Sequence, residues 1–189
     1  MFVDESLWIR DALAAVPLAP GASLLDVGSS TLHFRTVAQS WVDGNVFAPL
    51  RARGVRILHL DARSDPGVDI VADAAQLDGI DQAFDVVVAA NVLEHVIDRD
   101  GTLRNLRRLV RPGGLLPVTV PHRYPLHPDP IDTGFRPTAD VLAALIGWPD
   151  LLRQEVLAIG EREHYHGARF WRRRLRPWQV ACILVRRPG

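Results

Sequence analysis

Two acidic residues stand at the ends of short apolar runs, where a sheet would present them to a ligand. Asp26 closes the run at 23–25, and Gly28 follows it, which permits a sharp backbone turn and leaves room for a ligand. Asp61 closes a similar run at 57–60, where a carboxylate can accept both hydroxyl protons of a ribose. The pattern indicates a cofactor loop of the nucleotide-binding type.

A second group of polar residues lies in segment 121–137, which contains five prolines and no apolar period. We expect a long ordered loop that leaves the carboxyl end of a strand, where open α/β sheets bind ligands. His122 and His127 are the candidate catalytic bases, because histidine has a suitable pKa. The candidate substrate-binding residues of this loop are Arg123, Tyr124, Asp129, Asp132 and Arg136. The alternative that these residues only cap and brace the loop stays open.

The same loop has histidine and aspartate at a spacing that could offer nitrogen and oxygen ligands to a metal ion. The residues are His122, His127 and Asp129. This spacing matches no metal motif that we can justify, and proline-rich loops often use such residues for turns. We therefore predict no metal site.

The composition favours one domain over residues 1–189. A hydrophobic content of 48% suffices for a sizeable core, and 22 basic residues balance 22 acidic ones. The charge therefore does not favour nucleic acid or an anionic membrane as a partner. No apolar run approaches the ~20 residues that cross a bilayer, and the single cysteine, Cys182, cannot form an internal disulfide. We expect a cytoplasmic protein and leave open whether it forms a homodimer.

Apolar periodicity alternates between strand-like runs and helical stretches, the order typical of a parallel sheet covered on both faces. Strands are expected at 23–27, 56–60, 69–72, 84–90, 115–120, 155–159 and 179–185, helices at 7–16, 102–110 and 138–146, and a helical or irregular stretch at 34–53. The glycines at 113–114 are expected to end one helix and turn into the next strand. Segment 169–178 is rich in arginine and aromatic residues, which suits phosphate or nucleic acid, but we favour a solvated connection.

Five motifs, in this order, resemble those of class I methyltransferases that use S-adenosylmethionine (SAM), of the small-molecule type: LLDVGSS, LHLDA, VADAAQL, FDVVVAANVLEHV and LVRPGGLLPVTVP. The resemblance covers residues 20–122 well and the rest loosely. It implies an α/β fold with a doubly wound, Rossmann-like seven-stranded sheet. That sheet would be mostly parallel with an antiparallel last strand, and SAM would lie across the strand ends.

The resemblance assigns roles to the first two strand ends. Asp26 would begin the motif whose glycine, Gly28, approaches the amino acid portion of SAM. Asp61, followed by Ala62, would bind the ribose hydroxyls.

The resemblance also assigns roles after the third and fourth strands. Asp73 with Ala74 would flank the adenine, the carboxylate accepting from its exocyclic amine. Asn91 would face the methionine end, with Leu93 beneath it and His95 close to the substrate opening. Two alternatives stay open, namely that Asp73 only caps a turn and that His95 is structural.

The glycine loop departs from the family pattern, which usually has further glycines, as in GxGxG. Here Ser29 and Ser30 follow the first glycine, and their hydroxyls could hydrogen-bond the SAM carboxylate. The same change could instead mark weakened binding.

The function that the resemblance implies is transfer of a methyl group from SAM to an oxygen or nitrogen atom of a small molecule, such as a sugar or a specialised metabolite. The alternative is a non-catalytic SAM-binding partner or regulatory subunit. A dinucleotide oxidoreductase is not favoured, because GxGxxG is absent and Asp61 comes later than the ~20 residues that this fingerprint expects.

Overall fold

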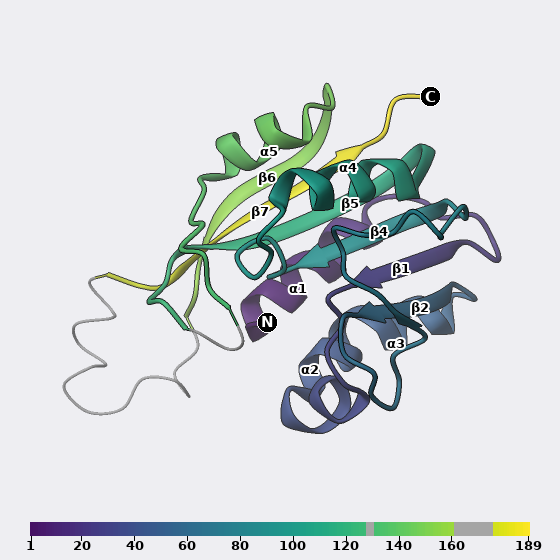
Figure 1. The fold of residues 1–189 in the computed structure, drawn as a ribbon, viewed down its shortest axis with the longest axis horizontal. Coiled ribbons are helices and arrows are strands. Elements are labelled where there is room, and N and C mark those ends of the chain that lie inside the picture. Colours follow the sequence, from purple (N-terminus) through teal and green to yellow (C-terminus); the bar gives the residue numbers. More distant parts are fainter. Residues whose placement is uncertain (128–130, 161–175) are drawn as a thin grey trace.

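The computed structural model describes residues 1–127, 131–160 and 176–189. Its centre is a seven-stranded sheet with the order β3-β2-β1-β4-β5-β7-β6 (Figure 1). The strands are β1 (Ser23–Val27), β2 (Arg56–Asp61), β3 (Ile70–Val71), β4 (Phe84–Ala90), β5 (Val110–Arg123), β6 (Asp150–Ala158) and β7 (Gln179–Arg186). Asp129 and most of segment 169–178 lie outside the described residues, so no structural statement is made about either prediction.

The direction of the strands confirms the predicted fold class. Strands β3, β2, β1, β4 and β5 pair in parallel, whereas β7 pairs antiparallel with both β5 and β6. The carboxyl ends of β1, β2 and β4 therefore meet at one edge of the sheet, on both sides of the point where the strand order reverses. Open α/β sheets bind their ligands at such a point.

Helices cover both faces of the sheet. The regular helices are α1 (Val3–Ala14), α2 (Ser40–Val42), α3 (Ala48–Ala52), α4 (Arg99–Leu109) and α5 (Ala139–Ile146), and two π-helical turns, η1 (Phe34–Ala38) and η2 (Asp43–Phe47), flank α2. Figure 1 shows α4 and α5 on one side of the sheet and α2 and α3 on the other. Within the described part of the chain, no helix combines the length and the apolarity that crossing a membrane requires.

The sheet has a hydrophobic core on each face, and side chains of β4 alternate between the two cores. Val87 and Ala89 belong to the core beneath α4 and α5, while Val86 and Val88 belong to the core beneath α1 and the helices at 40–52. Successive strand residues point to opposite faces, so the continuous apolar run of β4 is buried on both sides. The prediction of a strand at 84–90 is confirmed to the residue.

The fifth strand differs from its prediction. The glycines at 113–114 were expected to form a turn before a strand at 115–120, but β5 begins at Val110 and runs to Arg123. The backbone N–H of Gly113 donates to the Arg187 carbonyl at 3.0 Å, and that of Arg187 donates to the Gly114 carbonyl at 2.9 Å. Pairing with the chain after β7 thus keeps the glycine segment within the sheet, which a local turn signal cannot reveal.

Candidate functional site

A cavity of about 1020 Å³ opens at the carboxyl ends of the parallel strands. Its wall contains most of the residues predicted to bind a cofactor: Asp26, Gly28, Ser29, Ser30, Asp61, Ala62, Asp73, Ala74, Asn91 and His95. It also contains Tyr124 and His127 from the loop after β5. The structure therefore places the strand-end acids and part of the proline-rich loop on one continuous surface.

The loop after β1 turns sharply and is fastened to β2. Gly28 has a φ of +72°. The backbone N–H groups of Gly28 and Ser29 both donate to the Leu60 carbonyl, at 2.8 and 2.9 Å. The N–H of Ser30 donates to Oδ2 of Asp61 at 2.8 Å, which fixes this carboxylate at the cavity wall.

Arg35 holds this loop in place through hydrogen bonds. The sequence analysis did not predict a role for this residue. Its side chain is buried, and its guanidinium donates to the carbonyls of Ser29 at 3.0 Å, of Ser30 at 2.6 Å and of Gly67 at 2.6 Å. A fixed set of guanidinium donors can hold a backbone path that lacks the usual glycines. Nothing in the sequence distinguishes this arginine from the many others in the chain.

Asp26 is buried and forms a pair with a histidine on the neighbouring strand. Its Oδ2 lies 2.9 Å from Nδ1 of His59, and the parallel register of β1 and β2 sets the two residues side by side. Burial raises the pKa of Asp26, and the hydrogen bond with His59 opposes that rise. His59 thus gives the buried Asp26 carboxylate a hydrogen-bond partner, without which its burial would be unfavourable.

Asn91 occupies the turn after β4 and has a φ of +54°. Its Nδ2 donates to both carboxylate oxygens of Glu5, at 2.8 and 3.0 Å. Glu5 is fully buried and also accepts from the Thr119 hydroxyl and, at 3.0 Å, from the Phe2 N–H. With Nδ2 held in this way, Oδ1 of Asn91 has no hydrogen-bond partner among the described residues, and Asn91 lines the cavity.

Asp73 both caps a turn and lines the cavity. Its Oδ1 accepts from the Ala75 N–H at 2.9 Å, as the alternative interpretation expected, and the neighbouring Ala74 carbonyl accepts from Asn105 at 3.0 Å. The turn residue is therefore held at the cavity wall, and capping the turn is compatible with the predicted contact to adenine.

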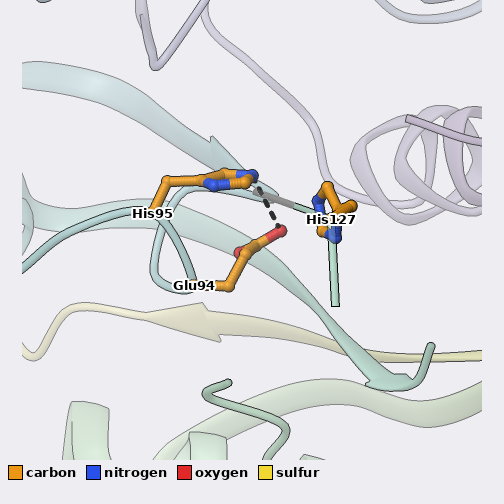
Figure 2. A group of neighbouring side chains, drawn as sticks. All are labelled: Glu94, His95 and His127. Atoms are coloured by element: carbon orange, nitrogen blue, oxygen red, sulfur yellow. Dashed lines mark ion pairs between the residues drawn. The ribbon is translucent and has the colours of Figure 1, made fainter. Parts of the chain in front are cut away.

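Glu94 is buried next to two histidine rings. Neither of its carboxylate oxygens has a hydrogen-bond partner among the described residues, and Nε2 of His95 lies 3.7 Å from Oε1 (Figure 2). The rings of His95 and His127 meet edge to face with centroids 5.0 Å apart. Burial raises the pKa of Glu94 to about 8.

Several predicted site residues lie away from the cavity wall. They are Leu93, which was predicted to bind the cofactor, and four residues of the predicted acceptor loop: His122, Arg123, Asp132 and Arg136. Leu93 is fully buried in the core, and Nδ1 of His122 lies 2.8 Å from the Pro137 carbonyl oxygen. The pairing of β5 with β7 is irregular here, and although Pro121 lines the cavity, the His122 ring lies against the segment before α5.

Asp132 and Arg136 brace the loop from within. Oδ2 of Asp132 lies 2.5 Å from Nη2 of Arg136 and 3.0 Å from Nδ1 of His127, and the Asp132 side chain is almost fully buried. The Arg136 hydrogen bonds hold the pKa of Asp132 well below its usual range. The bracing alternative therefore describes Asp132 and Arg136 better than substrate binding does.

Comparison with known proteins tests the family resemblance that the sequence motifs indicate. A family model described as a methyltransferase domain matches residues 25–118, the segment that contains β1, β2, β4 and the strand-end acids. The chain belongs to the class I SAM-dependent methyltransferase family. Within this family, the match to demethylmenaquinone methyltransferase from Renibacterium salmoninarum is 30% identical over 112 residues, covering 59% of this chain and 46% of that protein. The chain thus spans about half the length of the curated relatives it matches.

Solved structures share the methyltransferase fold over nearly the whole chain. The cyclase SpnF is 19% identical with a TM-score of 0.64, covering 97% of this chain and 80% of that one. A 1,6-didemethyltoxoflavin-N1-methyltransferase from Burkholderia thailandensis is 14% identical with a TM-score of 0.58, covering 98% and 77%. At these identities the likeness establishes the fold alone.

Four polar residues at or behind the site escaped the sequence analysis: the buried Glu5, Arg35 and Glu94 and the half-buried His59. Only Glu94 carried a usable signal, because it stands in the apolar run after a buried strand, where an acid is expensive without a function. An acid at position 5 looks like an ordinary charge at a helix start.

Proposed function

We propose that this protein binds SAM in the cavity and transfers its methyl group to an oxygen or nitrogen atom of a small molecule. The observation that carries the proposal is the convergence of Asp26, Asp61, Asp73 and Asn91, from four separate strand ends, on the same cavity wall as His95 and His127. A cavity of about 1020 Å³ has room for a cofactor and a small acceptor together.

The polar atoms of the wall match the polar groups of SAM. Asp61, held by the Ser30 N–H, would accept hydrogen bonds from the ribose hydroxyls. Asn91 lines the cavity, and its Oδ1, which is buried and has no partner among the described residues, would accept from the SAM ammonium group. Asp73, at the far strand end, would accept from the adenine amine.

Methyl transfer from SAM requires few protein groups. When bound, SAM supplies a methyl group already activated by its sulfonium. The protein must hold the acceptor in line and exclude water, and positioning of this kind contributes on the order of 7 to 11 kcal/mol to lowering a barrier. His127 is the better placed of the two predicted bases, because it lines the cavity and its Nδ1 faces the Asp132 carboxylate, which leaves Nε2 as the proton acceptor.

Aromatic side chains favour a small organic acceptor over a macromolecule. Phe2, Tyr124 and Trp178 line the cavity and contact one another, with ring centroids 4.8 to 6.0 Å apart. A wall of this kind suits a ring-containing substrate. The names of relatives, a demethylmenaquinone methyltransferase among them, support the same class of acceptor. A cytoplasmic location and the state of assembly stay predictions.

Two measurements test the proposal. Calorimetry with SAM and with NAD, on the same preparation, should show binding of SAM alone. Mass spectrometry after incubation with labelled SAM and a panel of sugars, specialised metabolites and a demethylmenaquinone analogue should then detect a methylated product. Binding of NAD without SAM would refute the proposal. SAM binding without any product across the panel would favour the non-catalytic alternative.

A further inference from the structure

The buried carboxylate of Glu94 is the starting point for a second site. The side chain is completely shielded from solvent, and both oxygens are without a hydrogen-bond partner in the described ranges. A buried carboxylate in this position is strongly unfavourable unless a proton or a cation accompanies it. Glu5, a second buried acid, already accepts hydrogen bonds from several donors.

The Nε2 atom of His95 directs its lone pair toward this carboxylate. Its Nδ1 lies within hydrogen-bond distance of the Ile131 carbonyl oxygen, which can only accept, so Nδ1 carries the proton. Nε2 then faces Oε1 of Glu94 at 3.7 Å, beyond the range of a hydrogen bond. Two electron-pair donors therefore face each other with a space between them.

His127 is oriented in the same way from the opposite side. Its Nδ1 lies 3.0 Å from Oδ2 of Asp132 and 3.4 Å from the Pro125 carbonyl oxygen, and both partners are acceptors. The proton again belongs on Nδ1, which leaves Nε2 as an electron-pair donor. A carboxylate or carbonyl behind each imidazole is the usual support of a metal-binding histidine.

The spacing of the three residues fits one ion. Glu94, His95 and His127 each offer one ligand atom, and these atoms lie within 4.8 Å of one another (Figure 2). Ligand atoms around a tetrahedral zinc ion are about 3.4 Å apart, given bonds of about 2.1 Å. The Glu94 to His95 spacing is already close to that value, so binding requires a modest inward movement of the His127 ring.

We propose that Glu94, His95 and His127 bind one divalent transition-metal ion of the zinc class, with its remaining coordination positions open to the cavity. Two imidazoles and one carboxylate favour such an ion over Mg²⁺ or Ca²⁺, which prefer oxygen ligands. All three residues line the cavity, so the open positions face the space where an acceptor would lie. This departs from the sequence prediction, which found no metal site and considered a different set of residues.

A bound ion would change the role of His127 in catalysis. This part of the inference rests on the proposed function. A metal-bound hydroxyl group loses its proton to solvent water more readily than an unbound one. His127 would then hold the ion through Nε2 instead of taking the proton itself. Turnover would depend on the metal, whereas a histidine base acting alone would not require one.

The test uses the full chain without a histidine tag, dialysed against a chelator. Calorimetry with Zn²⁺ and the visible spectrum with Co²⁺ should both show one tightly bound ion per chain. Glu94→Gln keeps the shape of the side chain and removes its charge, so it should weaken binding at least tenfold without unfolding the protein. His127→Ala should do the same. His33→Ala, which removes an exposed histidine outside the cluster, should bind as the unaltered chain does.

Three outcomes would overturn the proposal: no stoichiometric binding, equal binding by Glu94→Gln and the unaltered chain, or loss of binding in His33→Ala. Circular dichroism of each variant separates a lost ligand from a lost fold. SAM binding is measured on the same metal-free samples. If the ion binds and SAM does not, the proposed function fails and the metal site stands. If SAM binds and the ion does not, the metal site fails and the proposed function stands.

Discussion

Nδ2 of Asn91 donates to both carboxylate oxygens of Glu5, at 2.8 and 3.0 Å, across 86 positions of the chain. This contact ties the first helix to the turn after β4, and Oδ1 of Asn91, a residue that lines the cavity, is buried without a partner among the described residues. Glu5 thereby orients a residue that we propose to contact the cofactor, without itself lining the cavity.

Replacement of Glu5 should therefore lower both stability and cofactor affinity. Glu5→Ala leaves the buried donors of Asn91 and Thr119 without their acceptor, and each such group costs about 1–3 kcal/mol. We expect the free energy of unfolding in urea to fall by at least about 2 kcal/mol and SAM binding to weaken in calorimetry. Asp11→Ala, which breaks an exposed pair with Arg10, should change stability by less than about 0.5 kcal/mol. Equal stability of the two variants would contradict the role of Glu5.

Gly28 should not tolerate a side chain. A Cβ there would lie 2.5 Å from Cγ2 of Val92, and the φ of +72° is itself strained for other residues. Gly21→Ala is a matched control, because Gly21 has a φ of +74° and nothing within 4 Å of the added Cβ. Both variants should lose about 1–2 kcal/mol from backbone strain, and Gly28→Ala about 1–3 kcal/mol more from the contact with Val92. Urea unfolding measures the difference, and similar losses in the two variants would show that the loop can move away from Val92.

Asp61→Asn should weaken SAM binding without harming the fold. The amide keeps an oxygen for the Ser30 N–H and gives up only the exposed hydrogen bond from the Arg63 N–H, but it loses the charge that would accept from the ribose hydroxyls. A hydrogen bond to a charged group contributes about 1.5–3 kcal/mol, so the dissociation constant from calorimetry should rise at least tenfold. Asp65→Asn makes the same charge change at an exposed residue nearby and should bind SAM normally. An unaltered dissociation constant in Asp61→Asn would remove the ribose contact from the model of binding.

His127→Ala should separate binding from turnover. The residue lines the cavity from the loop after β5, not from the strand ends that carry the acids proposed to hold SAM. We expect the SAM dissociation constant to stay within a few-fold, while turnover with an accepted substrate falls by about 10² or more. A variant with normal turnover would exclude His127 from the mechanism, both as base and as metal ligand.

Asp85 should make stability depend on pH at the acidic end. Partial burial tends to raise its pKa, but hydrogen bonds from the Ser23 N–H, the Ser23 hydroxyl and Arg111 outweigh this and lower the pKa below its ordinary value. Its contribution is therefore complete above the unfolded pKa of about 4 and is lost as the pH falls below that value. Relative to Asp85→Asn, the unaltered chain should be more stable by a constant amount from pH 7 to about 5, and this advantage should shrink by pH 3.

Urea unfolding at each pH measures this difference. Asp81→Asn, at an exposed position close by, provides the control and should show no such trend. An advantage of Asp85 that stays constant down to pH 3 would mean that its hydrogen bonds do not favour the charged form.

The sequence by itself determined the strand set and the acids at the strand ends. Continuous apolar runs specify strands buried on both faces, and a run that ends in Asp26 or Asp61 places that acid at the edge where parallel strands finish. These are local properties, because each depends only on neighbouring residues. For the same reason β4 could be predicted to the residue, while the start of β5, which depends on pairing with the chain after β7, could not.

The tertiary structure alone decided which side chains meet. The contact of Glu5 with Asn91, the pair of Asp26 with His59, and the approach of His127 to Glu94 and His95 join segments that are distant in the sequence, and no local pattern predicts them. It also decided that His127, and not His122, lines the cavity, because the loop after β5 brings His127 beside His95 while the His122 ring lies against the Pro137 carbonyl. A polar residue acquires its role from the partner it meets when buried, and only folding brings distant partners together.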